Sequence, residues 1–560
     1  MTRRIVSGIV IAILIVAMLV LALSWFTNTR LTDLADLVAD GAIVQLREEM
    51  RDGGATEARV LVIALDGVGP VEFREAVESG RLPHVARLLG DTTSEDGVYT
   101  QGFAPRGVLS ILPSTTYAAW TAVYTGEPVG RSGVAGNEWF DRETMTFVAP
   151  APVSVPEHRD ALRVYSDALL DDWITPPTVF ERADVRSYVT LAAQHRGADL
   201  LIRPDPLALG DLVANFTAGV ATGDDVDQDK YGALDVSGVE NTLEAIERFG
   251  LADLQVVYFP GVDLYTHVAE EPLDSQVHYM AEVIDPLIGR LMDAYEERGA
   301  LDNTYVLFVS DHGHTPSLDA ERNALGTGSD DEWPAILEDA GFRLRPFELE
   351  TSATDFQAVF AYQGAFAYLH LADRSTCPNE GDDCNWRLPP RMEEDVLEAV
   401  RLIDRINRTG DIAPGMTGVI DLIFAREPRG IAEGRPFQVW DGQALVPIAQ
   451  YLSRNPRPDL VDLEERLDAL ATGRFGHRAG DVLLLSRYRA IDPIEERFYF
   501  SKTYRSWHGS PSLQDSEILW VMARRGASGG ELQARMEAAI GRRPSQLDFT
   551  PLVLDLLGRR

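Results

Sequence analysis

The stretch ARVLVIALDG, residues 58–67, decides the fold, because it is a continuous apolar run that ends on Asp66. Neighbouring side chains of a strand point to opposite faces of the sheet, so such a run is typical of a strand buried on both faces. Residues 253–259, DLQVVYF, and 304–310, TYVLFVS, share the pattern. Helical patterns lie between these runs, for example LPHVARLLG at residues 82–90. Strands that alternate with helices predict an α/β fold with a central, mostly parallel sheet flanked by helices.

Residues 340–490 have a different pattern. They contain FQAVFAYQGAFAYLHL, which is typical of paired strands, and RMEEDVLEAVRLIDRI, which has the spacing of an amphipathic helix. Pro- and Gly-rich loops separate these elements. We therefore predict an inserted α+β cap over about 340–490, within one large domain of residues 58–560. The central sheet is expected to resume near SEILWVMAR, residues 516–524.

The N-terminus carries an apolar segment of membrane length. Residues 5–26 hold no charge, and a helix needs roughly 20 residues to span a bilayer. Two arginines precede the segment and favour a cytoplasmic N-terminus. We predict a signal anchor, a transmembrane helix in the lipid bilayer, over residues 1–27, followed by a helical juxtamembrane stalk over residues 28–57. A signal peptide cleaved near residues 22–24 is the alternative. Either interpretation places the remaining chain outside the cytoplasm, in the periplasm or the extracellular space.

Charge and cysteine content narrow the classes of partner. The 560 residues carry a formal net charge of −36, which would repel nucleic-acid phosphates, so we expect no binding of a nucleic-acid polymer. Cys377 and Cys384 bracket a short polar loop and predict a disulfide, which fits an oxidising compartment. No further cysteine exists to complete a thiolate metal site.

Each of the three buried runs ends near an aspartate, namely Asp66, Asp263 and Asp311. The carboxyl ends of parallel strands meet at one edge of the sheet, where open α/β sheets bind their ligands. His267 and His312 follow two of these aspartates closely. Carboxylates with imidazoles suit zinc, and hard oxygen ligands also admit manganese. A single aspartate at a strand end could instead cap a helix, but the five residues together predict a metal site.

Two further segments offer candidates. His508, in SWHGSP, could bind a metal or simply pack in the core. Residues 111–126, ILPSTTYAAWTAVYTG, run from a proline and three hydroxyl groups into a helical pattern. Ser114, Thr115 or Thr116 could cap that helix. Alternatively, one of these hydroxyls lies at the helix N-terminus, where anions are favoured, as a nucleophile that a metal activates.

The motifs together resemble a known family. ALDG, PSTTYAAWTAVYTG, DLYTH, SDHG and WHGSP occur in the order and spacing of the alkaline phosphatase superfamily, and the chain resembles its type I phosphodiesterase/nucleotide pyrophosphatase family. TPPTVFERA, SGVAGNEWFD and GAFAYLHL are also similar to segments of bacterial members. The resemblance runs from residue 58 to the C-terminus. It implies an alkaline-phosphatase-like α/β sandwich that binds two divalent metal ions, zinc or, as the alternative, manganese.

The resemblance also implies roles for individual residues. Thr116, the third residue after Pro113, would be the nucleophile. One metal would be held by Asp66, Thr116, Asp311 and His312, and the other by Asp263, His267 and His508. Independently of the resemblance, aromatic groups directly after the nucleophile suit an apolar or stacking leaving group, so we predict that Tyr117 and Trp120 contact the substrate. His314 falls where the family has no ligand, so it would either support the ligands or take no part.

On these grounds we predict a membrane-anchored, extracytoplasmic two-metal hydrolase of a small-molecule phosphate ester, a phosphodiesterase/pyrophosphatase acting through a phospho-threonine. The alternatives are a phosphomonoesterase or sulfatase of the same superfamily, or an inactive exported binding protein of this fold. Residues 117–120, directly after Thr116, carry no positive charge that would match a monoester dianion, and this favours diesters. Ala119 offers no side-chain donor to a phosphoryl oxygen, so we expect a nucleoside substituent to add little.

Overall fold

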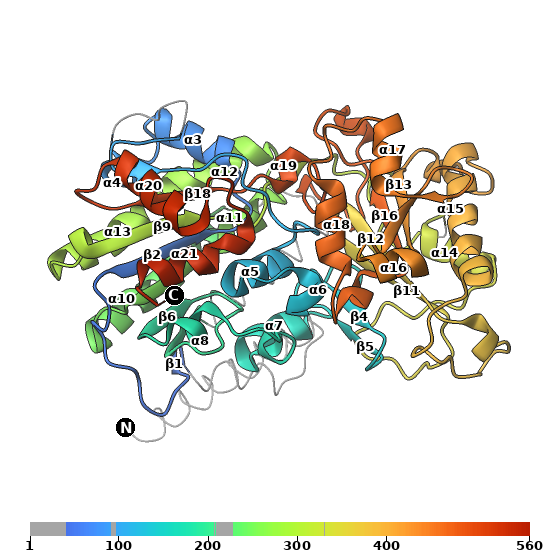
Figure 1. Cartoon of the computed structure of the whole chain (residues 1–560), viewed down its shortest axis with the longest axis horizontal. Coiled ribbons are helices and arrows are strands. Elements are labelled where there is room, and N and C mark those ends of the chain that lie inside the picture. Colours follow the sequence, from blue (N-terminus) through green and yellow to red (C-terminus); the bar gives the residue numbers. More distant parts are fainter. Residues whose placement is uncertain (1–40, 91–96, 206–207, 209–227, 330, 560) are drawn as a thin grey trace, which may run out of the picture.

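The computed structural model describes residues 41–90, 97–205, 208, 228–329 and 331–559. Its centre is an eight-stranded sheet of order β1-β7-β6-β8-β2-β9-β18-β3 (Figure 1). In that order the strands are β1 (Ile43–Gln45), β7 (Leu200–Ile202), β6 (Ser187–Thr190), β8 (Leu254–Phe259), β2 (Arg59–Leu65), β9 (Thr304–Val309), β18 (Trp520–Ala523) and β3 (Gly102–Phe103). The strands from β7 to β9 run parallel, and the pairs at both edges are antiparallel. The α/β prediction is confirmed, with a mixed sheet.

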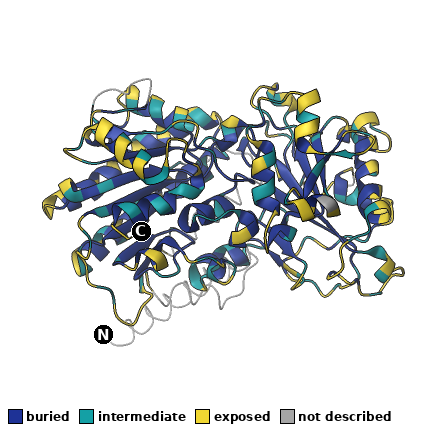
Figure 2. Ribbon diagram, in the orientation of Figure 1, coloured by how far each residue is buried: buried dark blue, intermediate teal, exposed yellow. Residues whose placement is uncertain are grey.

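The three strands predicted from the sequence, β8, β2 and β9, lie side by side in the middle of this sheet. Residues 60–65 of β2 are all buried although they point to alternate faces, so both faces are covered. Figure 2 shows these strands as a dark blue interior beneath helices with exposed outer faces. Leu65 pairs with Phe259, and Ala64 pairs with Val309. The three carboxyl ends therefore lie at one edge.

Helices cover the sheet in two groups whose members contact one another in series. The first group consists of α3 (Pro70–Glu78), α4 (Pro83–Leu89), α10 (Gln228–Phe249), α11 (Gly261–Thr266), α12 (Pro272–Tyr279) and α13 (Asp285–Glu297). The second group consists of α5 (Thr116–Thr125), α8 (Val179–Ala183), α20 (Gly529–Ile540) and α21 (Phe549–Leu556). The helix predicted at residues 82–90 is α4.

A second sheet of six antiparallel strands stands beside the first, in the yellow and orange part of Figure 1. In sheet order its strands are β11 (Ala358–Gln363), β12 (Phe366–Leu371), β16 (Val482–Ser486), β13 (Ile420–Arg426), β14 (Phe437–Trp440) and β15 (Leu445–Val446). Its helices are α14 (Trp333–Asp339), α15 (Leu397–Thr409), α16 (Pro428–Glu433), α17 (Ile448–Arg454) and α18 (Leu463–Ala471). All of these elements except α14 lie within residues 340–490, the segment predicted as the α+β cap, and Cys377 and Cys384 form a disulfide there.

Short elements join the two parts. They are the two-stranded ribbons β4 (Trp139–Asp141) with β5 (Thr146–Val148) and β10 (Thr315–Pro316) with β17 (Ser506–Trp507), and the helices α6 (Val129–Ser132), α7 (Arg159–Ser166) and α19 (Leu513–Ser516). Helix α5 lies at the junction of two hydrophobic cores. Ala118 and Ala122 belong to the core of the cap, whereas Trp120 and Tyr124 belong to the core around the first sheet. The first residue of α5 is therefore fixed from both sides.

The predicted helical stalk is wrong for the part that the structure describes. Residues 43–45 form β1, an edge strand in which Ile43 pairs with Ile202 of β7. The backbone N–H of Leu46 then donates to the carbonyl of Asp199 at 2.9 Å. Ile43 and Met50 pack against a small core at this edge of the sheet instead. The predicted anchor and the first part of the stalk lie in residues 1–40, outside the described residues. From residue 41 onward, no described helix combines the length and hydrophobicity needed to cross a bilayer.

Candidate active site

The three strand-end aspartates meet at the carboxyl edge of the sheet. Asp66 directly follows β2, and Asp311 follows β9 after one serine. Asp263 lies in helix α11, which begins one residue after β8 ends at Phe259. All three side chains are buried. The convergence predicted from the sequence is therefore present.

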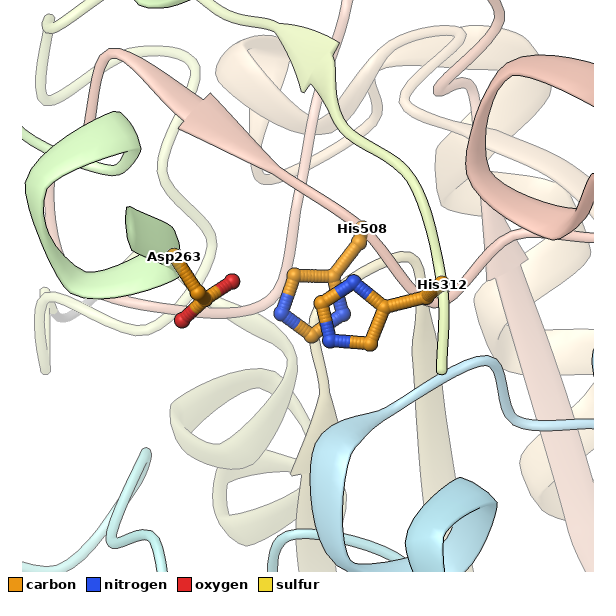
Figure 3. Close-up of side chains that lie close together, drawn as sticks. All are labelled: Asp263, His312 and His508. Carbon is orange, nitrogen blue, oxygen red and sulfur yellow. The ribbon is translucent and has the colours of Figure 1, made fainter. Parts of the chain in front are cut away.

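Three histidines complete the cluster, and they come from different parts of the chain. His312 adjoins Asp311, whereas His267 lies one helical turn after Asp263 and donates its backbone N–H to the Asp263 carbonyl at 3.0 Å. His508 follows β17, which pairs with β10 just beyond Asp311. The rings of His312 and His508 stack with centroids 3.6 Å apart. Figure 3 shows both rings facing the carboxylate of Asp263.

Each of the three imidazoles has one nitrogen fixed as a donor. Nδ1 of His267 lies 2.8 Å from the carbonyl of Ser506, and Nδ1 of His508 lies 2.9 Å from the carbonyl of Ser114. Nδ1 of His312 lies 3.1 Å from the carbonyl of Gly313. A carbonyl only accepts, so Nδ1 carries the proton in each ring. In its neutral form, each ring therefore presents an Nε2 lone pair.

The carboxylates show the same division between a bonded atom and a free one. Gly67 donates its backbone N–H to Oδ1 of Asp311 at 3.0 Å, and the Tyr258 hydroxyl donates to Oδ2 of Asp66. His314 lies against Oδ1 of Asp263, with Nε2 at 2.7 Å. Among the described residues, Oδ1 of Asp66 and Oδ2 of Asp311 are buried and have no hydrogen-bond partner. Buried carboxylate oxygens without donors favour a bound proton or a cation.

The spacing of these free atoms fits metal ions. Nε2 of His312 lies 3.4 Å from Oδ1 of Asp66 and 3.3 Å from Oδ2 of Asp311, and Nε2 of His267 lies 3.4 Å from Oδ2 of Asp263. Tetrahedral zinc with ligands at about 2.0–2.1 Å places neighbouring ligand atoms about 3.3 Å apart. Asp66, Asp311 and His312 form one group with converging ligand atoms, and Asp263 forms another with His312 and His508 or with His267 and His314. The donor set fits the two ions that the family implies.

The two groups differ in charge. Burial and the nearby Asp311 carboxylate raise the pKa of Asp66 well above its ordinary value, and burial raises the pKa of Asp311 to about 6. Burial would also raise the pKa of Asp263, but His267 and His314 together hold it well below its ordinary value. Burial lowers the pKa of His312. A cation is therefore needed most between Asp66 and Asp311.

The structure separates the three hydroxyl candidates. The Ser114 hydroxyl donates to the carbonyl of Ser510 at 3.0 Å, and the Thr115 hydroxyl is buried without a partner among the described residues. Thr116 is the first residue of α5, and its Oγ1 lies 3.3 Å from Nε2 of His312. Of the three, only Thr116 lines the cavity at the metal cluster. The geometry therefore supports Thr116 as the nucleophile.

A cavity of about 220 Å³ opens beside Thr116 and the metal cluster. Prolines, leucines and aromatic rings form most of its wall. The aromatic residues are Tyr117, Tyr165, Tyr258, Tyr504 and Trp507. Tyr117 thus lies where the substrate contact was predicted. The prediction for Trp120 needs correction, because its ring points into the core, where it stacks on Tyr124 with centroids 5.7 Å apart.

Sequence reasoning missed Asn137, which also lines the cavity. Its Oδ1 accepts the backbone N–H of Tyr117 at 3.3 Å, which leaves its amide N–H groups as donors toward the cavity. Asn137 could therefore supply the side-chain donor that Ala119 lacks. The signal was present in SGVAGNEWFD, where one amide stands in a Gly-rich, apolar segment.

Known proteins resemble the chain in sequence and structure. The family model described as type I phosphodiesterase / nucleotide pyrophosphatase matches residues 60–327. Murine ectonucleotide pyrophosphatase/phosphodiesterase 5 shares 12% identity over 89% of this chain and 95% of its own, with a TM-score of 0.48. Phosphonoacetate hydrolase from Sinorhizobium meliloti 1021, in complex with phosphonoformate, shares 13% over 91% and 100%, with a TM-score of 0.44. The family match covers residues 60–327, and this part of the chain, which contains six of the seven predicted ligands, is similar to the type I phosphodiesterase/nucleotide pyrophosphatase family.

Proposed function

We propose that the chain is a two-metal phosphodiesterase that acts through a phospho-threonine on Thr116. The observation that carries this proposal is the convergence of the Thr116 hydroxyl with free carboxylate and imidazole atoms beside a cavity. One ion would be held by Asp66, Thr116, Asp311 and His312, and the other by Asp263, His267 and His508. Zinc is the metal that the ligand spacing favours, with manganese as the alternative.

The residues of the chain supply nucleophile, orientation and shielding. Oγ1 of Thr116 attacks phosphorus from the N-terminus of α5, where the helix dipole favours the negative charge of the phosphoryl group. The amide of Asn137 donates to a phosphoryl oxygen. Bound divalent ions would lower the pKa of the Thr116 hydroxyl and neutralise charge on the phosphoryl oxygens.

Two displacements complete the turnover. In the first, the bond between Thr116 Oγ1 and phosphorus forms while the bond from phosphorus to the leaving oxygen breaks, and that oxygen takes up a proton. In the second, water attacks phosphorus, the bond to Thr116 breaks and the hydroxyl returns. The product is a phosphate monoester and an alcohol.

Charge at the cavity favours diesters over monoesters. Among the described residues that line it, none is lysine or arginine. Burial lowers the pKa of His158, which keeps that imidazole of the wall neutral. Arg106, the cation nearest to Thr116 in the preceding sequence, is exposed and does not line the cavity. Apart from the metals, a monoester dianion would thus meet no cation in the wall of the cavity, whereas a diester carries one negative charge less.

The wall of the cavity favours a flat or apolar substituent. Aromatic rings stack on planar groups, and a volume of about 220 Å³ suits one ring better than a long chain. The hydroxyl groups of Tyr117 and Tyr165 add polar contacts in this wall. We therefore propose diesters with one aromatic or compact apolar substituent as the preferred substrates.

The proposal is tested with three substrates that share a leaving group. We expect kcat/KM for bis-p-nitrophenyl phosphate to exceed that for p-nitrophenyl phosphate at least ~10-fold, or about 1.4 kcal/mol. A p-nitrophenyl nucleoside ester should fall close to the plain diester. Asn137→Ala should lower kcat for all three substrates, because it removes a donor to the phosphoryl oxygen. Faster cleavage of the monoester would contradict the diesterase assignment.

We further propose that the N-terminal segment anchors the chain with its catalytic part outside the cytoplasm. The uncharged run of residues 5–26 and the disulfide of Cys377 with Cys384 support this location. Full-length protein should sediment with membranes, and a reporter that works only in the exported compartment should be active when fused after Arg560. A soluble chain that starts near Trp25 would show that the segment is cleaved instead.

A further inference from the structure

His314, which the sequence left either as a support of the ligands or without a part, lies within hydrogen-bond distance of a carboxylate of the metal cluster. It follows Gly313 in the loop that leads from β9 to β10, and its side chain is fully buried. Its Nε2 lies 2.7 Å from Oδ1 of Asp263, and its Nδ1 lies 3.1 Å from the hydroxyl of Ser506. Both ring nitrogens are thus held by the protein.

The distances separate a hydrogen bond from shared metal ligation. Two ligand atoms on one tetrahedral zinc lie about 3.3 Å apart. The distance from His267 Nε2 to Asp263 Oδ2 is 3.4 Å, as expected for two ligands of one ion, whereas 2.7 Å from His314 is the length of a hydrogen bond to a carboxylate. An ionised carboxylate only accepts, so Nε2 of His314 donates to Oδ1 of Asp263 and leaves Oδ2 free to bind an ion.

The side chains of His314 and Asp263 pack tightly against the backbone of Gly67. A Cβ placed on Gly67 would lie 2.5 Å from Nε2 of His314 and 2.8 Å from Oδ1 of Asp263. The loop leads directly into β10, where Thr315 pairs with Trp507. The hydroxyl of Ser506 contacts Nδ1 of His314, and the carbonyl of Ser506 accepts the Nδ1–H of His267 at 2.8 Å. Both rings are thus oriented by one residue of β17.

We propose that His314 is a positioning residue that keeps Asp263 a one-oxygen ligand and thereby makes its group selective for zinc over manganese. This inference rests on the proposed function. A carboxylate that binds through both oxygens raises the coordination number, which suits manganese with its six oxygen-rich ligands better than four-coordinate zinc. The hydrogen bond from His314 occupies the second oxygen and keeps the number low.

The test compares zinc and manganese affinities in competition with a chelator, for the full chain and its variants. His314→Phe keeps a ring but removes the donor, and we expect zinc affinity at this group to fall ~10- to 100-fold. Manganese affinity should change less, so that the zinc-to-manganese ratio falls at least ~10-fold. His314→Gln keeps an N–H near Oδ1 and should remain within about threefold of the wild type. His370→Leu, a buried histidine of the second sheet, is the matched control and should change neither affinity.

Cobalt spectra distinguish positioning from ligation. The visible absorption of the cobalt-loaded chain reports the ligand set, so His314→Gln should keep the wild-type spectrum. A changed spectrum in this variant would show that His314 binds the metal and would overturn the inference. Unchanged zinc and manganese affinities in His314→Phe would overturn it as well. If that variant does not fold, Ser506→Ala replaces it, because this change removes the contact at Nδ1 of His314. Ser506→Ala should lower the ratio of zinc to manganese affinity about threefold. An unchanged ratio would contradict the inference. A wild-type chain without metal affinity would instead overturn the proposed function itself.

Discussion

The two metal-binding groups are built in opposite ways. Asp66 and Asp311 come from the ends of neighbouring parallel strands, so two buried carboxylates are brought together with His312 as the only imidazole. The other group has one carboxylate, Asp263, surrounded by imidazoles, and His508 reaches it from almost 200 residues beyond Asp311 in the sequence.

This difference appears in the protonation of the metal-free protein. Burial raises the pKa values of Asp66 and Asp311, and repulsion by Asp311 adds to the rise at Asp66, whereas the imidazoles lower the pKa of Asp263. The two-carboxylate group thus favours a bound proton until a metal replaces it, and the histidine-rich group already holds an ionised carboxylate. The two groups should respond differently to mutation, to pH and to metal removal.

The largest effect is expected at Thr116, which belongs to the two-carboxylate group through its 3.3 Å approach to His312. Thr116→Ala should lower kcat by ~10³-fold or more, because no phospho-threonine can form. Elemental analysis should still find both metals. Ser114→Ala and Thr115→Ala are the matched controls and should cost far less. If Thr115→Ala is the inactive variant, the nucleophile is assigned to the wrong residue.

Acidification should remove one metal before the other. Metal binding at Asp66 and Asp311 needs both carboxylates ionised, so its affinity should fall up to ~10-fold per pH unit as the pH drops through about 6, the pKa of Asp311. At the other group Asp263 stays ionised, and burial keeps His508 neutral by lowering its pKa. Metal content after dialysis at pH 7, 6 and 5 should show a stepwise loss. Simultaneous loss of both ions would contradict the difference between the groups.

The smallest effect concerns the stability of the metal-free chain, and its sign should differ between the groups. The folded-state pKa of Asp311 is raised, so its charge destabilises the fold above about pH 6 and this cost disappears as the pH falls toward 4. Asp311→Asn should therefore raise the free energy of unfolding at pH 8, on the order of 1 kcal/mol. Asp263→Asn should lower it, because the depressed pKa of Asp263 stabilises the fold above the unfolded pKa and Asn removes that contribution. Urea unfolding at pH 8 measures the free energy of unfolding of both variants. A change of the same sign in the two variants would contradict the difference between the groups.

The sequence predicted the parts of the molecule that follow local patterns. The apolar runs of β8, β2 and β9 are long and unbroken, and their ends place Asp66 and Asp311 without further information. The spacing of four residues from Asp263 to His267 also determines their common face on one helical turn. Edge strand β1 was missed because three residues are too few to show the alternation that distinguishes a strand from a helix.

Tertiary contacts account for what the sequence did not predict. Asn137 reaches the cavity through a loop whose position depends on the cap, where its backbone N–H donates to Gln363 at 2.9 Å. The role of His314 depends on its distance to Asp263, which lies 51 residues earlier in the chain. Trp120 was expected in the cavity, but its direction is set by the side of α5 that meets the first sheet. None of these directions follows from residue type or spacing.

The most direct test of the account is the metal content of the folded chain, measured by elemental analysis. The wild type should hold about two divalent ions per chain, and the paired variants Asp66→Ala/Asp311→Ala and Asp263→Ala/His267→Ala should each hold about one. Circular dichroism should confirm that both variants remain folded. A folded variant of either group that keeps the wild-type metal content would contradict the two-group site.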